Sequence, residues 1–420
     1  ARAYAGLSTV DFLRWTTYQE LTPAAAAALA APTATLADAE GLPGHALAAR
    51  LRGAANAAGV TMPGTRAATL SRTAYATLSP YDPGRLPCAT DLSDNTGLFG
   101  PAPSLRGALD GITDATITRY PSVYATDLKR ALADLLGVEP ANITTGCGSD
   151  DVIDSALRAF CEPGDTLAYA APTFGMVPVF ARMNAVRTLA VPLDTAFELD
   201  ADALLAARAR ITYLCRPNNP TGNAFARAAT ERVCRDAAGA VFIDEAYADF
   251  ADDDFARVAI ASDNTVVLRT LSKAYGMAGL RVGFAVGPAA LVAEIEKSRG
   301  PYKVNAIAEA AALRVLAQDR AWVAECAAEV RHNRDRLVGE LRSRGVSAFD
   351  SAANFVLLPV PGTAAAWNRE LRARGVAVRP FEQVGSAGEC LRVSIGPWPM
   401  LQAFLDAFDD VRSTFPAGET

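Results

Sequence analysis

Residues 265–283 read TVVLRTLSKAYGMAGLRVG, a short apolar run followed by a polar loop that holds one lysine. The β-branched residues at the start of this stretch favour a buried strand. Beyond the strand, Ser272 immediately precedes Lys273, Thr270 lies close by, and Arg281 follows eight residues after the lysine. The stretch therefore predicts a strand that ends in a cluster of hydroxyl and cationic groups.

Similar apolar runs recur upstream, at residues 166–170, 211–214 and 240–243. They alternate with stretches of helical periodicity, such as residues 152–160 and 224–238. This alternation predicts an α/β fold in which a mostly parallel sheet is covered by helices on both faces. In such folds ligands bind beyond the carboxyl ends of the strands. Downstream, a helical run at 289–344 precedes shorter strands at 354–359, 376–379 and 391–395.

Composition narrows the class of protein. The 420 residues carry a formal net charge of −6, and half of them are hydrophobic. The longest apolar runs are well short of the roughly 20 residues that a membrane-spanning helix needs. An acidic chain is also a poor match for nucleic acid or an anionic membrane. We therefore expect a soluble protein with neither nucleic acid nor membrane as a partner.

Cysteine and histidine usage argues against a metal centre. The seven cysteines are scattered and never spaced C-x-x-C, which indicates reduced thiols in a cytoplasmic protein. His45 and His332 are the only histidines, too few for a histidine-based metal site or a Ser-His-Asp triad. Asp252, Asp253 and Asp254 lack spaced oxygen partners, so we predict a solvated loop there and no metal.

Residues 1–80 differ from the rest of the chain because they are rich in alanine and threonine. The runs at 23–37 and 47–59 favour two or three short helices. The segment contains no lysine, which disfavours a fused DNA-binding module. It also lacks the basic start and apolar core of an export signal, and the start at Ala1 leaves a removed upstream signal open.

The predicted strand ends carry candidate binding groups. Asp244 follows the buried run 240–243, where a carboxylate without a cationic partner is costly. Asn219 lies in a Pro/Asn/Gly turn after the run 211–214. Residues 145–151 form a glycine turn that opens a helix, and the free amides of a helix N-terminus bind phosphate well. Thr270, Ser272 and Arg281 add further donors.

These groups together suit one cofactor. A molecule with a phosphate, a pyridinium nitrogen, a phenolic oxygen and an aldehyde would use the donors, the carboxylate, the amide and the lysine. Pyridoxal 5′-phosphate has all four, with Lys273 as the Schiff-base lysine.

The chain from about residue 88 to 415 resembles the class I/II, fold-type I aminotransferases, and among them the histidinol-phosphate aminotransferases. The resemblance rests on seven strings in family order. They are RYPSVYATDLKRAL, GCGSDDVIDSALRAFCEPGD, APTFGM, PNNPTG, DEAYADF, TLSKAYGMAGLRVGF and VRPF followed by CLRVSIG.

The resemblance implies a role for each matching residue. Lys273 would hold the cofactor covalently and transfer protons, Asp244 would pair with the ring nitrogen, and Tyr247 and Asn219 would bind the phenolic oxygen. The phosphate would be held by Ser149, Asp150, Thr270, Ser272 and Arg281. Phe174 would stack on the ring, and Tyr120 would reach the cofactor phosphate of a second subunit in a homodimer.

Substrate recognition is implied for Arg392 and Arg379, whose guanidinium groups suit carboxylate or phosphate. The family motif N-x-N-P-Y-G-P appears here as NTGLFGP from Asn95. Phe99 thus replaces a tyrosine whose hydroxyl helps bind the substrate phosphate. The loss of that hydroxyl weakens the expectation of histidinol phosphate as substrate. Gly97 and Leu98 also depart from the motif.

The resemblance also implies a division of the chain. We predict an alanine-rich helical extension (1–80), an N-terminal arm (81–120), a large cofactor-binding domain (121–295) and a small C-terminal α+β domain (296–420). The extension could cover the active site, strengthen the dimer or only pack against the fold.

Three functions are compatible with these residues. The first is an aminotransferase that moves an amino group between an anionic amine and a 2-oxo acid, with glutamate and 2-oxoglutarate as one pair. The second is a decarboxylase, lyase or cyclase of an amino acid on the same fold. The third is a non-enzymatic ligand sensor, which the intact Lys273 and Asp244 argue against.

Overall fold

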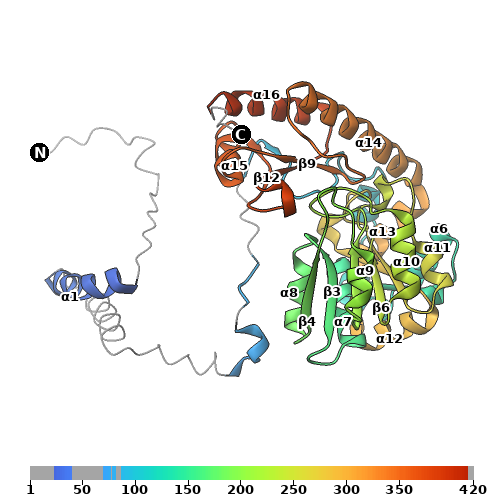
Figure 1. The fold of residues 1–420 in the computed structure, drawn as a ribbon. Helices are drawn as coiled ribbons and strands as arrows, with labels where there is room; N and C mark the ends of the chain where they lie inside the picture. The colour runs from blue at the N-terminus through green and yellow to red at the C-terminus, as the bar shows by residue number, and fades with distance from the viewer. Residues whose placement is uncertain (1–22, 40–69, 77, 82–86, 415–420) are drawn as a thin grey trace, which may run out of the picture. The chain divides into compact units, whose positions relative to one another are not determined.

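The computed structural model describes residues 23–39, 70–76, 78–81 and 87–414 (Figure 1). The chain divides into two compact units, Ala1–Ala76 and Thr77–Thr420. In the first unit, helix α1 (Pro23–Ala39) covers the first predicted alanine-rich run, and a 3-10 turn, η2, spans Thr73–Tyr75. The second predicted run, at 47–59, lies outside the described residues. The boundaries predicted at 80, 120 and 295 stay predictions.

A seven-stranded sheet forms the centre of the second unit. Its order is β2 (Ile143–Cys147), β8 (Val282–Val286), β7 (Thr265–Thr270), β6 (Ala240–Asp244), β5 (Ile211–Cys215), β3 (Thr166–Ala171) and β4 (Arg187–Pro192). Only β8 runs against the others, since it pairs antiparallel with both β2 and β7. The predicted mostly parallel sheet is therefore confirmed.

Helices cover both faces of this sheet (Figure 1). Along each strand, neighbouring side chains point to opposite faces, so Val266 packs in one apolar cluster and Val267 in another. The cluster with Val266 includes residues of α7 (Gly148–Phe160), α8 (Met176–Met183) and α12 (Ala289–Arg299). The cluster with Val267 includes residues of α6 (Thr126–Leu136), α9 (Ala201–Ala206), α10 (Arg227–Asp236), α11 (Ala256–Ala261) and α13 (Ala306–Gln318).

The C-terminal part carries a three-stranded antiparallel sheet of β11 (Arg379–Phe381), β12 (Cys390–Ser394) and β9 (Phe355–Pro359). Helices α14 (Arg320–Ser343), α15 (Ala364–Ala373) and α16 (Trp398–Thr414) belong to the same part. A short parallel pair joins β1 (Thr90–Asp91) to β10 (Val376–Ala377). This pairing matters for the site because it fixes the residues that follow β1 beside the C-terminal part.

Several predicted boundaries differ from the structure. The predicted glycine turn at 145–151 is divided, because its first three residues end β2 and helix α7 begins at Gly148. Helix α10 is shorter than predicted at both ends. The run 289–344 is three helices, because the left-handed Gly300 follows α12 and the Asn305 side chain caps α13. The predicted strand 376–379 divides between two sheets, as β10 and β11.

The shorter elements complete the described part of the chain. They are α4 (Leu105–Asp110), α5 (Asp114–Thr118), η3 (Pro140–Asn142), η4 (Ala248–Phe250), η5 (Ala278–Leu280) and η6 (Gly385–Ala387). No helix among the described residues is long and apolar enough to cross a membrane.

Candidate active site

A pocket lies beyond the carboxyl ends of β5, β6 and β7. It is lined by Ser149, Asp150, Phe174, Cys215, Asn219, Asp244, Ala246, Tyr247, Thr270, Ser272, Lys273 and Arg281. Parallel strands end at one edge of a sheet, which is why residues distant in sequence meet here. Every residue predicted to bind the cofactor, Tyr120 excepted, lines this pocket.

One end of the pocket gathers hydrogen-bond donors. Ser149 and Asp150 belong to the first turn of α7, where N–H groups have no partner within the helix. The side chain of Cys147, which precedes α7, makes no capping hydrogen bond. The Thr270 hydroxyl donates to Ser272 Oγ at 2.9 Å. These groups, with the helix dipole, suit a phosphate.

Arg281 closes this end of the pocket. Its Nη2 donates to Asp150 Oδ2 at 3.2 Å. Gly148 adopts a left-handed φ of 81°, and a Cβ there would collide with the Arg281 guanidinium. Only glycine at this position therefore leaves enough space for the guanidinium beside the turn. Burial raises the pKa of Asp150, although Arg281 acts in the opposite direction.

Asp244 is buried where β6 enters the pocket. Its Oδ2 accepts a hydrogen bond from the Tyr213 hydroxyl at 2.6 Å, and its Oδ1 accepts one from the Ala246 N–H at 3.0 Å. Burial raises the pKa of Asp244 to about 6 despite these donors. A cation bound beside this buried carboxylate stabilises its charged form, and a protonated ring nitrogen is such a cation.

Lys273 is buried as well. Its Nζ donates to the backbone oxygen of Asp94 at 3.5 Å and lies 5.7 Å from the centre of the Tyr247 ring. Burial, together with the positive charge of Arg392, lowers the pKa of Lys273 to about 8. The neutral amine, which is the nucleophilic form, is therefore accessible near neutral pH.

Asn219 lines the pocket and is hydrogen-bonded to Arg392, which does not line it. Arg392 Nη1 donates to Asn219 Oδ1 at 2.6 Å, and Nη2 donates to the Ser93 backbone oxygen at 3.0 Å. The guanidinium can only donate, so the bonded atom of Asn219 is its oxygen and the amide nitrogen is left to donate elsewhere. The Arg392 Nε is buried without a hydrogen-bond partner.

Arg379 lies directly opposite Arg392 in the register of β11 and β12. The Arg392 guanidinium also lies over the rings of Phe355 and Phe381, at 5.3 and 5.5 Å from their centres. Two arginines side by side, one of them buried, form an electropositive wall that suits an anionic ligand.

The comparison with known proteins agrees with this geometry. Residues 89–408 match the family model of aminotransferase class I and II. The chain belongs to this family. Among solved structures, this aminotransferase is similar to the histidinol-phosphate aminotransferase of Sinorhizobium meliloti in complex with pyridoxal 5′-phosphate, with a TM-score of 0.75 and 27% identity over 83% of this chain and 99% of that one.

Relatives of this aminotransferase are named for two different substrates. An aromatic amino acid aminotransferase of Rhodococcus erythropolis is 37% identical over 80% of this chain and 94% of the relative. A histidinol-phosphate aminotransferase of Nostoc is 31% identical over 80% of this chain and 96% of the relative. A second family model, histidinol dehydrogenase, matches residues 1–53.

The cofactor of the aminotransferase is pyridoxal 5′-phosphate. The pocket fits this molecule: α7 and Arg281 can receive the phosphate, the buried Asp244 can face the ring nitrogen, and Lys273 lines the same pocket. Among the described residues no cluster of acidic, histidine or cysteine side chains could hold a metal ion.

Four predicted residues do not line the pocket of the aminotransferase, namely Arg379 and Arg392, described above, and Tyr120 and Phe99. Tyr120 is 83% exposed and stacks on Tyr302, with ring centres 4.8 Å apart. Phe99 lines a smaller neighbouring cavity with apolar residues such as Trp322 and Val330, and Lys273 also borders that cavity. Gly97, a departure from the family motif, packs so closely on the backbone of residues 273–276 that a Cβ would clash there.

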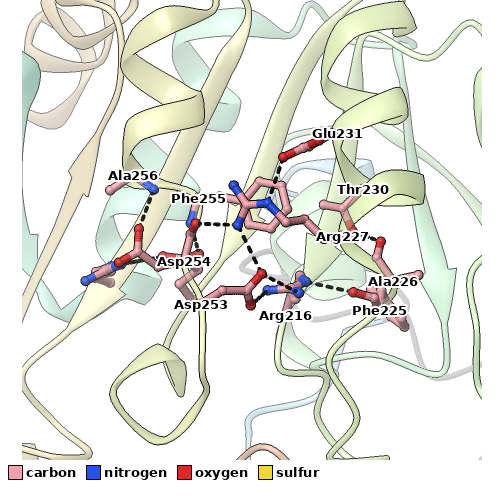
Figure 2. Close-up of polar contacts among 12 residues, drawn as sticks. Arg216, Phe225, Ala226, Arg227, Thr230, Glu231, Asp253, Asp254, Phe255 and Ala256 are labelled. Carbon is pink, nitrogen blue, oxygen red and sulfur yellow. Dashed lines mark hydrogen bonds and ion pairs between the residues drawn. The ribbon is translucent and has the colours of Figure 1, made fainter.

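The turn that carries Asn219 is held by an ion-pair cluster (Figure 2). Asp253 accepts hydrogen bonds from both Nη atoms of Arg216, at 2.7 and 3.2 Å, and from Arg227 at 3.0 Å. Both guanidinium groups lie over the Phe255 ring, at 4.8 and 4.9 Å from its centre.

The predicted solvated loop at 252–254 is exposed at Asp252 and Asp254, whereas Asp253 is half-buried. Asp253 is the counter-ion of the buried Arg216, and Asp254 pairs with Arg269 at 3.1 Å. The sequence could not reveal these pairs because the arginines come from other strands and helices.

Sequence reasoning missed three residues of the site. Tyr213 and Cys215 lie on β5, where their alternation with apolar residues looks like ordinary core. Asn95 is buried, and its Nδ2 donates to the Tyr247 hydroxyl at 3.2 Å. Its position at the start of the NTGLFGP string was a usable signal, because a buried asparagine needs hydrogen-bond partners.

Proposed function

We propose that this aminotransferase moves an amino group between histidinol phosphate and a 2-oxo acid, with glutamate and 2-oxoglutarate as the second pair. The observation that carries the choice of substrate is the match of residues 1–53 to histidinol dehydrogenase. Histidinol is histidinol phosphate without its phosphate, so one chain joins segments of two families named for closely related molecules. The relative from Nostoc and the structure from Sinorhizobium meliloti also support this substrate.

Aromatic amino acids are the second candidate. The Rhodococcus erythropolis relative supports them. Phe99 does so too, because its ring lacks the hydroxyl that the family tyrosine offers to the substrate phosphate. The apolar cavity around Phe99 is consistent with a less polar ligand nearby.

We propose that Lys273 performs the proton transfers. Bound pyridoxal phosphate supplies an electron-withdrawing ring that stabilises negative charge on the substrate Cα. The Lys273 amine, with its pKa lowered to about 8, would remove the proton from that atom and deliver it to the C4′ carbon of the cofactor, as amino-group transfer requires. Asp244 would keep the ring nitrogen protonated, which preserves the electron-withdrawing power of the ring.

The other lining residues would hold and orient the cofactor. Tyr247 and the Asn219 amide nitrogen would donate to the phenolic oxygen, and Phe174 would stack on the ring. The first turn of α7, with Ser149 and Asp150, would bind the phosphate together with Thr270, Ser272 and Arg281. These assignments are supported by the gathering of all these residues around one pocket.

Arg392 and Arg379 would bind the anionic group of the substrate. A buried guanidinium with an unpartnered Nε supports this role, because a bound anion would supply the missing acceptor. Phosphate and carboxylate both match the guanidinium fork, so this wall serves either candidate substrate and the second pair.

We further propose a homodimer in which Tyr120 faces a second copy of the chain. Tyr120 is 83% exposed and Ile117 is 68% exposed. Tyr124, which is close in the sequence, and Tyr302, which stacks on Tyr120, are partly exposed as well. Such a concentration of exposed apolar side chains is typical of an interface. Sedimentation of the wild type and of Tyr120→Glu tests this, and a monomeric wild type would contradict it.

We also propose that the enzyme works in the cytoplasm. None of the seven cysteines forms a disulfide, which agrees with a reducing compartment. Cell fractionation of the source organism would test this location.

The substrate is tested by half-reactions. Purified holoenzyme is mixed with one amino donor and no 2-oxo acid, and the absorbance of the bound cofactor is followed for histidinol phosphate, glutamate, phenylalanine and tyrosine. We expect histidinol phosphate and glutamate to react, with phenylalanine slower by about tenfold or more at equal concentration. A faster reaction with phenylalanine or tyrosine would establish the second candidate instead.

Two variants sharpen this experiment. Lys273→Ala should fold and bind the cofactor without converting it with any donor, and conversion by this variant would contradict the role of the lysine. Phe99→Tyr should lower the KM for histidinol phosphate and leave that for phenylalanine unchanged, if the phosphorylated substrate is the natural one.

A further inference from the structure

Asn95 connects the pocket to the C-terminal part of the chain. It is 1% exposed and adopts a left-handed backbone with φ 56°. Its side chain bonds to Tyr247 and Ser394, and its backbone oxygen accepts a hydrogen bond from Asn354 at 3.0 Å. Asn95 does not line the pocket, although Tyr247 does.

The hydrogen bonds around Asn95 begin at a donor that cannot reverse. The backbone N–H of Asn95 donates to Ser394 Oγ at 2.9 Å. A backbone N–H is only a donor, so the Ser394 oxygen accepts there and has its single proton left to donate. That proton goes to Asn95 Oδ1 at 2.9 Å.

This arrangement determines which way the Asn95 amide faces. With Oδ1 engaged by Ser394, the Nδ2 group faces the Tyr247 hydroxyl at 3.2 Å. An amide NH₂ donates and does not accept, so the Tyr247 oxygen is the acceptor in this bond. The proton of Tyr247 is therefore directed away from Asn95.

We propose that Asn95 is a positioning residue that directs the hydroxyl proton of Tyr247 to the phenolic oxygen of the cofactor. The inference rests on the proposed role of Tyr247. A donated hydrogen bond stabilises the negatively charged phenolic oxygen, and it lowers the pH at which the bound cofactor loses its proton. Without Asn95, the Tyr247 hydroxyl could rotate and accept from the cofactor, or donate elsewhere.

The hydrogen bonds of Asn95 also connect Tyr247 to the strand that carries Arg392. Ser394 and Arg392 lie on β12, two residues apart. Through Ser394 and Asn95, the orientation of the Tyr247 hydroxyl depends on the position of that strand. Asn95 thus links the protonation of the cofactor to the placement of the substrate-binding wall.

The test uses the pH dependence of the visible absorbance of the bound cofactor, which does not depend on turnover. Asn95→Asp keeps the shape of the side chain but offers Tyr247 an acceptor, so the Tyr247 proton turns toward the carboxylate. We expect the pH midpoint of the absorbance to rise by about one unit. As a control, Asn333→Asp changes an asparagine that is equally buried and does not contact Tyr247. It should lower stability without moving the midpoint.

The Tyr247→Phe variant separates this inference from the proposed function. Tyr247→Phe should raise the midpoint, and Asn95→Asp should add nothing in that background. If Tyr247→Phe shifts the midpoint but Asn95→Asp does not, the role of Asn95 is wrong and that of Tyr247 stands. If Asn95→Asp shifts it equally in both backgrounds, the added charge is the cause and the inference is overturned.

Two further outcomes are decisive. No shift in Tyr247→Phe would overturn both the inference and the proposed role of Tyr247. Should Asn95→Asp fail to fold, Ser394→Ala provides the test, since it removes the group that fixes the Asn95 amide. It should raise the midpoint in the same direction, and an unchanged midpoint in that variant would contradict the inference.

Discussion

Arg392 Nη1 donates a 2.6 Å hydrogen bond to Asn219 Oδ1, although 173 positions separate the two residues in the chain. The bond joins the wall proposed to bind the substrate to the amide proposed to bind the cofactor. Burial lowers the pKa of Arg392 to about 10, and the neighbouring Arg379 acts in the same direction. A bound anion would offset both effects.

Replacing Arg392 should therefore weaken substrate binding. We expect Arg392→Ala to raise the KM of the anionic substrate roughly 10- to 150-fold, as for the loss of a charge-assisted hydrogen bond. Because Asn219 also loses its partner, the absorbance of the bound cofactor should change. Arg369→Ala, which alters an exposed arginine on α15, is the matched control. A KM unaffected by Arg392→Ala would place the anion site elsewhere.

Asp244 should make the cofactor-free protein sensitive to pH. Its pKa is raised from 3.8 to about 6, so the folded state binds a proton more tightly than the unfolded state. Stability is thus greatest below pH about 4 and is lost as the pH rises through 6. Relative to Asp244→Asn, the free energy of unfolding should fall by up to about 3 kcal/mol over this range.

Chemical denaturation of both proteins at a series of pH values measures that difference. Adding pyridoxal phosphate should reduce the slope, because the ring nitrogen would pair with the carboxylate. Parallel stability curves of the two cofactor-free proteins would show that Asp244 does not titrate in this range.

Asp253 should stabilise the turn that carries Asn219. Asp253→Asn leaves the buried guanidinium of Arg216 without its counter-ion, and we expect a loss of about 1–3 kcal/mol. Asp252→Asn removes a neighbouring exposed carboxylate of the same loop and should change stability by less than about 0.5 kcal/mol. Equal effects of the two substitutions on thermal unfolding would argue against the ion-pair cluster.

Gly148 should be required for cofactor binding. Gly148→Ala forces a left-handed alanine, at about 1–2 kcal/mol, and displaces the Arg281 guanidinium. Gly164→Ala also has a positive φ, 94°, but a Cβ there meets no neighbour. We expect both variants to lose stability and only Gly148→Ala to bind pyridoxal phosphate less tightly, about tenfold or more. Titration of the cofactor-free proteins measures this, and unchanged affinity in Gly148→Ala would contradict the phosphate site.

The sequence by itself determined the class of fold and the identities of most of the residues around the pocket. A parallel sheet is buried on both faces, so its strands are nearly continuous apolar runs. Runs such as 265–268 therefore predict strands. Asp244, Lys273 and Arg281 were predictable because strand ends of such a sheet lie at one edge. These features depend on local periodicity and on motifs, which a single sequence contains.

Only the tertiary structure decided how these residues are connected. The partners of Asn219, Tyr247 and Arg216 are Arg392, Asn95 and Asp253, each supplied by a different segment of the chain. Hydrogen-bond direction and ion pairing depend on distances of about 3 Å between side chains. Nothing in local periodicity specifies such distances, because packing of the whole chain fixes them.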